Sequence, residues 1–327
     1  MPHRAPEDLV EATRAGDRAA LARLLSMVER GGDDARAAGR ALRTGGACAY
    51  AVGITGAPGA GKSTLTSALV ELVRRGGERV AVLAVDPSSP FTGGALLGDR
   101  IRMGDHALDD GVFIRSMATR GHLGGLAVAA PEAVRVLSAA GYPWVLLETV
   151  GVGQVEVEVV GQADTTVVVL NPGWGDAVQA NKAGLLEIAD VFVVNKADRP
   201  GAEEARRDIE RMLDVARHGT WRPPVVPASA VTATGVGDVW QAVRRHRAHL
   251  EASGHLAERR RRRAADEVSR LVAAQVLARA RQAVAGARGR ELAAAVAAGD
   301  LDPWHAADEL LDGLGGGRPV APPARGG

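Results

Sequence analysis

The chain contains a single cysteine, Cys48, among its 327 residues. One thiol cannot form a disulfide within the chain or supply a cysteine pair to a metal site. Cys48 directly precedes an apolar, strand-like run, so we expect its side chain to be buried. No apolar run approaches the ~20 residues of a membrane span, and no N-terminal stretch resembles a signal peptide. We therefore expect a cytoplasmic protein with no membrane partner.

Net charge and aromatic residues are also scarce. The formal net charge is +1 and aromatic residues make up 3% of the chain, so the core must be mostly aliphatic. A net charge near zero argues against nucleic acid as a partner. The densest basic run, Arg259–Arg263, follows Glu258 in a helix-like segment. We expect this run to form a helix surface facing solvent or a subunit, with an anionic partner as the alternative.

Lysine is nearly absent: three of the forty basic residues are lysines and the other thirty-seven are arginines. Arginine serves as well as lysine on a solvated surface, but a planar guanidinium cannot replace a compact ammonium in a tight site. Lys62 and Lys196 lie inside two of the motifs described below, so we expect both to serve a site. The third, Lys182, lies between them in a stretch that carries Gly and Asp, and the residues alone leave its role open.

Short aliphatic runs alternate with helix-like segments between residues 46 and 254. Buried strands that alternate with helices indicate a parallel sheet covered on both faces, and hence an α/β fold. The runs are Ala49–Ile54, Val80–Val85, Val112–Ile114, Val145–Leu147, Thr166–Leu170, Val191–Val194 and Pro224–Val226.

The rest of the chain is mostly helix-like. We expect an N-terminal helical extension over residues 1–45, a nucleotide-binding domain over 46–254, and an Ala-, Arg- and Leu-rich helical arm over 255–314. Residues 315–327 are rich in Gly and Pro and are expected to be disordered. The apolar stripe of the N-terminal extension consists of Leu9, Leu21, Leu24 and Leu25.

A glycine-rich loop joins the first aliphatic run to an amphipathic helix. Its pattern, Gly56-x-x-x-x-Gly61-Lys62-Ser63, is that of a P-loop, in which backbone N–H groups wrap phosphates and the helix N-terminus adds its dipole. Lys62 would neutralise the β- and γ-phosphates, and the Ser63 hydroxyl would bind Mg²⁺. The expected phosphate site is Gly56, Ala57, Pro58, Gly59, Ala60, Gly61, Lys62, Ser63 and Thr64.

A second motif, Asn-Lys-Ala-Asp, directly follows the run Val191–Val194. A carboxylate at its last position can accept hydrogen bonds from N1–H and the 2-amino group of guanine, whereas adenine lacks this donor pair. Downstream of a P-loop, the motif therefore indicates GTP and GDP rather than ATP. The expected base site is Asn195, Lys196 and Asp198, backed by Ser229 and Ala230 after the next strand.

Two further stretches place carboxylates where a metal ion would lie. Glu148 begins Glu-Thr-Val-Gly151, where GTPases commonly carry Asp-x-x-Gly; the acid reaches Mg²⁺, usually through water, and the Gly amide senses the γ-phosphate. A carboxylate that caps the following turn is the alternative. Asp86 ends another strand and opens a Pro-, Ser- and Gly-rich loop suited to reorganise with the nucleotide state. Asp99, later in that loop, is either a metal-site residue or a helix cap.

No cluster of metal ligands stands out elsewhere. His246 and His249 share a helix face and have no visible partners in the sequence, so we expect ordinary surface histidines.

With its motifs in this order, the chain resembles the methylmalonyl-CoA mutase-associated GTPases of the MeaB/ArgK type over nearly its whole length. The resemblance is carried by the P-loop, Asp86-Pro-Ser-Ser-Pro, Thr92-Gly-Gly, Leu97-Gly-Asp-Arg-Ile-Arg-Met103, Thr119-Arg-Gly121, Glu148-Thr-Val-Gly-Val-Gly-Gln154, Pro172-Gly-Trp-Gly-Asp176, Glu187-Ile-Ala-Asp190 and Asn195-Lys-Ala-Asp198.

The resemblance implies a P-loop NTPase fold of the SIMIBI type and a homodimeric GTPase that chaperones an adenosylcobalamin-dependent acyl-CoA mutase. Such proteins gate cofactor loading and protect or rescue the mutase. By motif match, Asp86, Asp99 and Glu148 belong to the Mg²⁺ and switch site. The stretch Pro172–Asp190, with Lys182, corresponds to the loop through which the mutase accelerates hydrolysis, and the C-terminal arm corresponds to the dimerisation element.

Three other functions compete with this one. A metallochaperone GTPase would need Cys and His metal ligands, which one cysteine does not favour. A kinase would need an acceptor site and fits poorly with a guanine motif. A non-catalytic binding module is disfavoured by the intact Lys62, Ser63 and Glu148.

Overall fold

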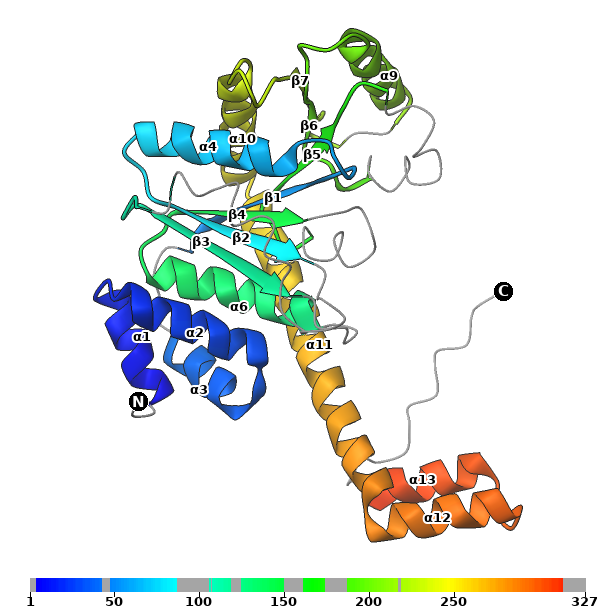
Figure 1. The fold of residues 1–327 in the computed structure, drawn as a ribbon. Coiled ribbons are helices and arrows are strands. Elements are labelled where there is room, and N and C mark those ends of the chain that lie inside the picture. The colour runs from blue at the N-terminus through cyan, green and yellow to red at the C-terminus, as the bar shows by residue number, and fades with distance from the viewer. Residues whose placement is uncertain are drawn as a thin grey trace. The chain divides into compact units, whose positions relative to one another are not determined.

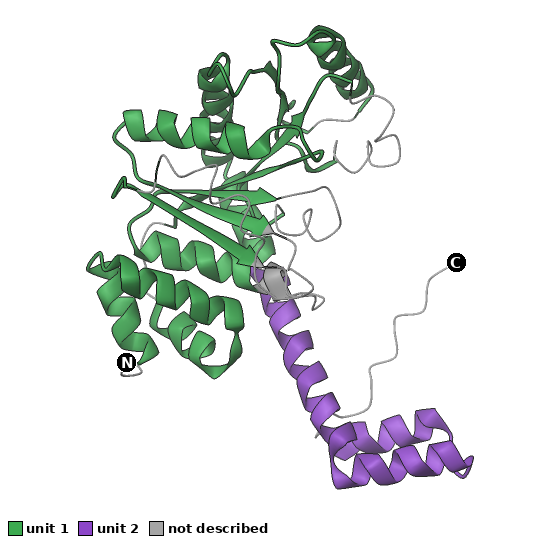
Figure 2. Cartoon of the chain, in the orientation of Figure 1, with its two compact units in different colours: residues 1–263 green, residues 264–327 purple. Residues whose placement is uncertain are grey.

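A computed structural model describes residues 4–42, 48–86, 106, 108–118, 125–149, 161–173, 187–216 and 219–313. The chain divides into two compact units, residues 1–263 and 264–327 (Figure 2). The boundary falls inside helix α11, His255–Ala285. No described helix is both long enough and apolar enough to cross a membrane.

The first unit is built on a seven-stranded sheet in the order β3-β2-β4-β1-β5-β6-β7, and all its pairings are parallel. The predicted parallel sheet is thereby confirmed. The strands are β1 Tyr50–Gly56, β2 Val80–Asp86, β3 Val112–Ala118, β4 Trp144–Thr149, β5 Thr165–Leu170, β6 Val191–Val194 and β7 Val225–Pro227.

Strand β3 runs four residues beyond the aliphatic run that predicted it. Its extension carries Arg115, which donates to Glu29 at 2.9 Å and to the Ser26 hydroxyl at 2.9 Å on an N-terminal helix. Because β3 is an edge strand, a polar side chain on it can bind groups of a helix that packs beside the sheet.

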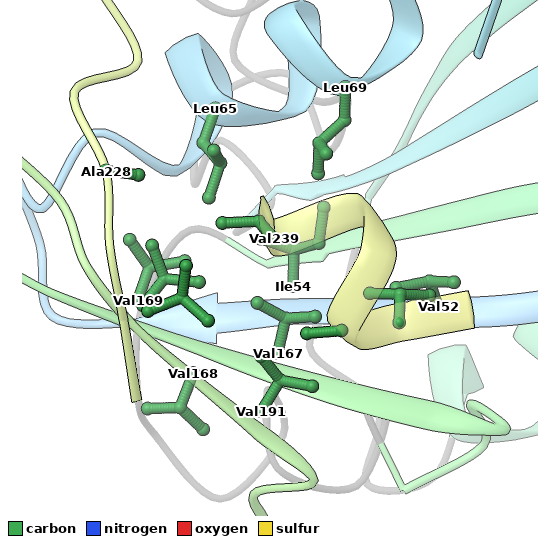
Figure 3. Close-up of a cluster of buried hydrophobic side chains, with 14 of the residues drawn as sticks. Val52, Ile54, Leu65, Leu69, Val167, Val168, Val169, Val191, Ala228 and Val239 are labelled. Atoms are coloured by element: carbon green, nitrogen blue, oxygen red, sulfur yellow. The ribbon is translucent and has the colours of Figure 1, made fainter. Parts of the chain in front are cut away.

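Helices cover both faces of the sheet (Figure 1). One face packs against α4 Lys62–Arg75, α9 Ala202–Val215 and α10 Val236–Ala252. Figure 3 shows the middle of this core, where Leu65 and Leu69 of α4 lie over the aliphatic side chains of β1 and β5. The other face packs against α6 Gly125–Ala139, and the N-terminal helices pack against α6 in turn.

The N-terminal extension folds as three helices, α1 Pro6–Arg14, α2 Arg18–Arg30 and α3 Gly32–Leu42. The Asp17 carboxylate caps α2 by accepting from the N–H groups of its first turn. Gly31 ends α2 at a φ of +71°. The predicted apolar stripe is buried, because these helices pack against one another and against α6; its members are Leu9, Leu21, Leu24 and Leu25.

The second unit contains the rest of α11 followed by α12 Ala287–Ala298 and α13 Pro303–Gly313. Leu292 and Ala306 are buried between α12 and α13, and Arg288 donates to Glu309 at 2.6 Å. Along α11, Val268, Val272 and Val276 are between 52% and 60% exposed.

Cys48 corrects one prediction, because its side chain is exposed rather than buried. Burial begins one residue later: Ala49 is 4% exposed, and Tyr50 is the first residue of β1. The aliphatic run that suggested burial therefore starts just after the thiol.

Candidate functional site

The P-loop connects the carboxyl end of β1 to the first turn of α4, as predicted. Gly56 has a φ of +141°, and a Cβ there would lie 1.9 Å from the Val169 carbonyl oxygen of β5. Gly61 has a φ of +89°, and its Cβ would lie 2.4 Å from Asn195 Nδ2. Both positions therefore require glycine, the first for packing against the sheet and the second for contact with the base motif.

Lys62 is the first residue of α4 and is 6% exposed. Its Nζ donates to the carbonyl oxygens of Gly56 at 2.9 Å and Ala57 at 3.0 Å. The ammonium is thus held inside the loop by two carbonyl groups. A buried point charge in this position is suited to bind phosphate oxygens that the loop encloses.

The Ser63 hydroxyl donates to Glu148 Oε1 at 2.5 Å. Glu148 lies near the end of β4 and is 2% exposed. The next residue, Thr149, donates to the Thr55 hydroxyl of β1 at 3.1 Å, which joins the carboxyl ends of the two strands. A hydroxyl and a carboxylate in contact beside a P-loop are the hard oxygen donors that Mg²⁺ prefers, so these residues fit the predicted ion.

The base motif contacts the P-loop directly. Asn195 Nδ2 donates to the Ala60 carbonyl at 2.8 Å, and Asn195 Oδ1 accepts from the Ala230 N–H at 3.0 Å. Lys196 has a φ of +58°, and its Nζ donates to the Gly59 carbonyl at 2.7 Å. One buried amide therefore connects the phosphate loop, the end of β6 and the Ser-Ala dipeptide predicted to back the base.

Asp198 is exposed at the end of this motif, where a guanine base would be read. A hydrogen bond from the Ser229 side chain is the main reason that the pKa of its carboxyl is below the usual range. The carboxylate is therefore ionised and can accept from N1–H and the 2-amino group of guanine. The Ala197 N–H donates to the Ala228 carbonyl at 3.0 Å, which keeps the motif next to the Ser229 loop.

Of the predicted site residues, Asp86 is only partly described, and Asp99 and Lys182 are not described. Asp86 is the last residue of β2, which is separated from β1 by β4. The side chain of Asp86, and all of Asp99 and Lys182, lie outside the described residues.

His246 corrects a second prediction, because it is 0% exposed rather than on the surface. Its Nδ1 lies 2.8 Å from the Thr165 hydroxyl, and its Nε2 lies 3.3 Å from Asp190 Oδ1. Burial is the main reason that its pKa falls to about 4, so the ring is neutral. His249 is half-buried beside Trp221 and lines a cavity of about 630 Å³ that contains none of the nucleotide-motif residues. No group of three or more metal-ligand residues lies within the described ranges.

The arginine run of α11 corrects a third prediction. Arg259, Arg260 and Arg263 do not form a purely solvated surface, since each donates to the buried carboxylate of Asp164 or Asp190. Sequence reasoning did not single out Asp164, and it quoted Asp190 only as the last residue of a family motif. The only available signal was an acidic residue directly before each of two aliphatic strands.

Comparison with known proteins finds similarity to GTPases over most of the chain. A family model described as methylmalonyl Co-A mutase-associated GTPase MeaB matches residues 21–285. A putative GTPase of Pyrococcus abyssi is 48% identical over 315 residues, 95% of this chain and 97% of that protein. The GTPase ArgK of Escherichia coli is 38% identical over 285 residues, 82% of this chain and 84% of that protein. The crystal structure of a LAO/AO transport system kinase matches with a TM-score of 0.69 and 28% identity, over 97% of this chain and 99% of that one.

Proposed function

The chain belongs to the family of methylmalonyl-CoA mutase-associated GTPases, and on this basis we propose that it is a Mg²⁺-dependent GTPase that chaperones an adenosylcobalamin-dependent acyl-CoA mutase. It binds guanine nucleotide and hydrolyses GTP to GDP and phosphate. In the proposal it works in the cytoplasm, gates cofactor loading, protects or reactivates the mutase, and has no nucleic-acid or membrane partner.

The contact between base motif and P-loop is the observation that carries the nucleotide part. Asn195 ties the phosphate loop to the Ser229 loop, and the ionised Asp198 then reads the base at a fixed position relative to the phosphates. A site built this way favours guanine because adenine would leave the carboxylate without its two donors.

The residues of the loop divide the chemistry of hydrolysis among themselves. P-loop N–H groups and Lys62 would bind the β- and γ-phosphates and offset the negative charge that builds up as the bond to the leaving GDP breaks. Ser63 would hold Mg²⁺, with Glu148, Asp86 and Asp99 in its surroundings; the ion neutralises phosphate charge when bound. The attacking water adds to the γ-phosphorus, and its proton leaves with phosphate.

The proposed homodimer is supported by the exposed valines of α11. Val268, Val272 and Val276 repeat every four residues and so lie on one face of the helix. Apolar side chains that are half exposed in a regular stripe are suited to pack against the same stripe of a second copy.

Two experiments test the identity of the client: capture of the mutase by the tagged protein, and measurement of GTP turnover with the mutase present. The tagged protein, purified from its native host, should retain a cobalamin-dependent acyl-CoA mutase, and that mutase should raise GTP turnover. For GTPases that lack a supplied cation, a partner protein raises the rate of hydrolysis on the order of 10³- to 10⁵-fold. Neither capture nor stimulation by any such mutase would contradict the chaperone proposal while leaving the GTPase intact.

Lys182 is proposed to act in that stimulation. Either it pairs with a switch carboxylate such as Asp86, or it supplies positive charge to the transition state when the mutase is bound. Lys182→Ala should keep the basal rate and nucleotide affinity but lose most of the stimulation, and Lys182→Arg should also be impaired because a planar guanidinium replaces a point charge. Full stimulation of Lys182→Ala would return this residue to the role of a surface lysine.

A further inference from the structure

Two buried threonines face each other at the carboxyl ends of β1 and β4, next to the P-loop. The backbone pairing of these parallel strands reaches Ile54 opposite Glu148. Thr55 and Thr149 are the next residue on each strand, and both are 0% exposed. The Thr149 hydroxyl donates to the Thr55 hydroxyl at 3.1 Å and lies 3.4 Å from the Ile54 carbonyl oxygen. We call Thr55 and Thr149 the threonine pair.

The threonine pair interrupts an aliphatic layer. Side chains alternate between the two faces of a sheet, so both threonines lie on the face that packs against α6. Leu147 of β4 and Val85 of β2 are buried on the same face, and Val85 lies opposite Thr149. Valine would fill either threonine position with the same shape and without a hydroxyl, whose burial is unfavourable unless it is hydrogen-bonded. Two bonded hydroxyls in this layer therefore indicate a role beyond filling the core.

One member of the pair is joined by a peptide bond to the metal-site carboxylate. Thr149 directly follows Glu148, which is 2% exposed and whose Oε1 accepts from the Ser63 hydroxyl at 2.5 Å. Because the peptide unit between the two residues is planar and stiff, a displacement of Thr149 also displaces Glu148. The hydroxyl bond on one face of β4 thus bears on the carboxylate on the other face.

The other member is joined in the same way to the first residue of the P-loop. Thr55 directly precedes Gly56, whose carbonyl oxygen accepts from Lys62 Nζ at 2.9 Å. On the side of β5, Gly56 is paired with Val169. On the side of β4, the threonine pair continues the contact one residue beyond the backbone pairing. The start of the loop is therefore held from both neighbouring strands.

We propose that the threonine pair is a positioning element of the metal site, which keeps the Glu148 carboxylate at a fixed distance from Ser63 and the P-loop. This inference rests on the proposed Mg²⁺-dependent hydrolysis. Residues that orient metal ligands typically change metal affinity or activity by about 10–100-fold when they are replaced. The base motif has its own contact with the P-loop through Asn195. Loss of the pair should therefore weaken the response to Mg²⁺ more than it weakens nucleotide binding.

The test uses valine variants, which keep the shape of threonine and lack its hydroxyl. Thr149→Val and Thr55→Val each remove the hydrogen bond of the pair. Thr165→Val is the matched control, because Thr165 is also 0% exposed and its hydroxyl lies 2.7 Å from the Tyr50 hydroxyl, at the amino end of β5. All three variants lose a buried hydrogen bond within the same sheet, so a general loss of stability should appear in all three.

Single-turnover GTP hydrolysis by the full-length protein is measured over a Mg²⁺ titration, and the Kd for GDP is measured in EDTA. Both are recorded at a temperature where circular dichroism shows each variant folded. The wild-type curve alone tests whether hydrolysis depends on Mg²⁺, whereas the difference between wild type and variants tests the threonine pair. The proposed function and this inference can therefore fail separately.

We expect Thr149→Val and Thr55→Val to raise the Mg²⁺ concentration at half-maximal rate by about tenfold, with an unchanged Kd for GDP. Thr165→Val should match wild type in both measurements, and Thr149→Ser, which keeps the hydroxyl, should restore the wild-type Mg²⁺ response. A wild-type Mg²⁺ midpoint in both valine variants would overturn the proposal, and so would an equal shift in Thr165→Val or no recovery in Thr149→Ser. If Thr149→Val does not fold, Thr55→Val decides, since it removes the same bond from the other strand.

Discussion

The contact between Gly61 and Asn195 allows a sharp test of how the P-loop and base motif depend on each other. Gly61→Ala places a Cβ 2.4 Å from Asn195 Nδ2, whereas Gly59→Ala in the same loop meets no atom within 4 Å. Both glycines have positive φ, +89° and +72°, so both substitutions carry a similar backbone strain. If Gly61→Ala loses more unfolding free energy than Gly59→Ala, the difference therefore reports the displacement of the Asn195 amide.

The expected difference in unfolding free energy follows from the hydrogen bond that Asn195 makes to the Ala230 N–H. Strain at a left-handed position costs about 1–2 kcal/mol for a residue with a Cβ. A displaced Asn195 would also leave the buried Ala230 N–H without its acceptor at 3.0 Å. An unsatisfied buried donor costs about 1–3 kcal/mol. Gly59→Ala should thus lose about 1–2 kcal/mol of unfolding free energy, and Gly61→Ala about 1–3 kcal/mol more.

The assay is urea unfolding of the nucleotide-free, full-length protein, followed by tryptophan fluorescence. A double-mutant cycle with Asn195→Ala isolates the contact, because the clashing atom is then absent and Gly61→Ala should cost no more than Gly59→Ala. Equal costs for the two glycine variants in the wild-type background would refute this reasoning. The same cost of Gly61→Ala with and without Asn195 would refute it as well.

Three other substitutions and two truncations test the remaining assignments. Asp198→Asn should weaken GDP binding and favour xanthine nucleotide, whose 2-oxo group can accept from an amide; equal affinity of the wild type for ATP and GTP would contradict the base assignment. Lys62→Ala should abolish phosphate release from GTP and weaken nucleotide binding in titration calorimetry. Glu148→Ala should raise the Mg²⁺ concentration needed for turnover, and an unchanged Mg²⁺ titration would show that this acid has another role. A chain ending at Arg263 should be a soluble monomer by light scattering if the arm holds the dimer, whereas one ending at Gly254 should lose stability by about 3–5 kcal/mol because buried carboxylates lose their arginines.

The sheet and the nucleotide motifs were predictable because their signals are local. Strands such as β5 and β6 consist of consecutive β-branched or aliphatic residues, which read as buried strands without knowledge of their neighbours. The P-loop and the Asn195–Asp198 motif each need a particular order of residues within a few positions. Their mutual contact, through Asn195 and Gly61, was not predicted and is seen only in the structure, where both motifs lie at carboxyl ends of parallel strands.

The pairing of the α11 arginines with Asp164 and Asp190, and the burial of His246, were not predictable for the opposite reason. Arg260 and Asp164 are separated by 96 positions, and His246 and Thr165 by 81. The sequence of an arginine run on a helix does not show whether the side chains face solvent or bind buried carboxylates. Its pairing is decided by how α11 packs against the amino ends of β5 and β6, which no local pattern encodes.

The exposed thiol of Cys48 makes the beginning of α11 accessible to spectroscopy. It is the only cysteine in the chain, so a maleimide fluorophore or spin label would attach at one position without further engineering. The neighbouring Ala49 carbonyl accepts from Arg260 at 3.1 Å, which places the label beside this arginine and away from the P-loop. Its emission or line shape, recorded through a single round of GTP hydrolysis, would report whether the surroundings of Arg260 change.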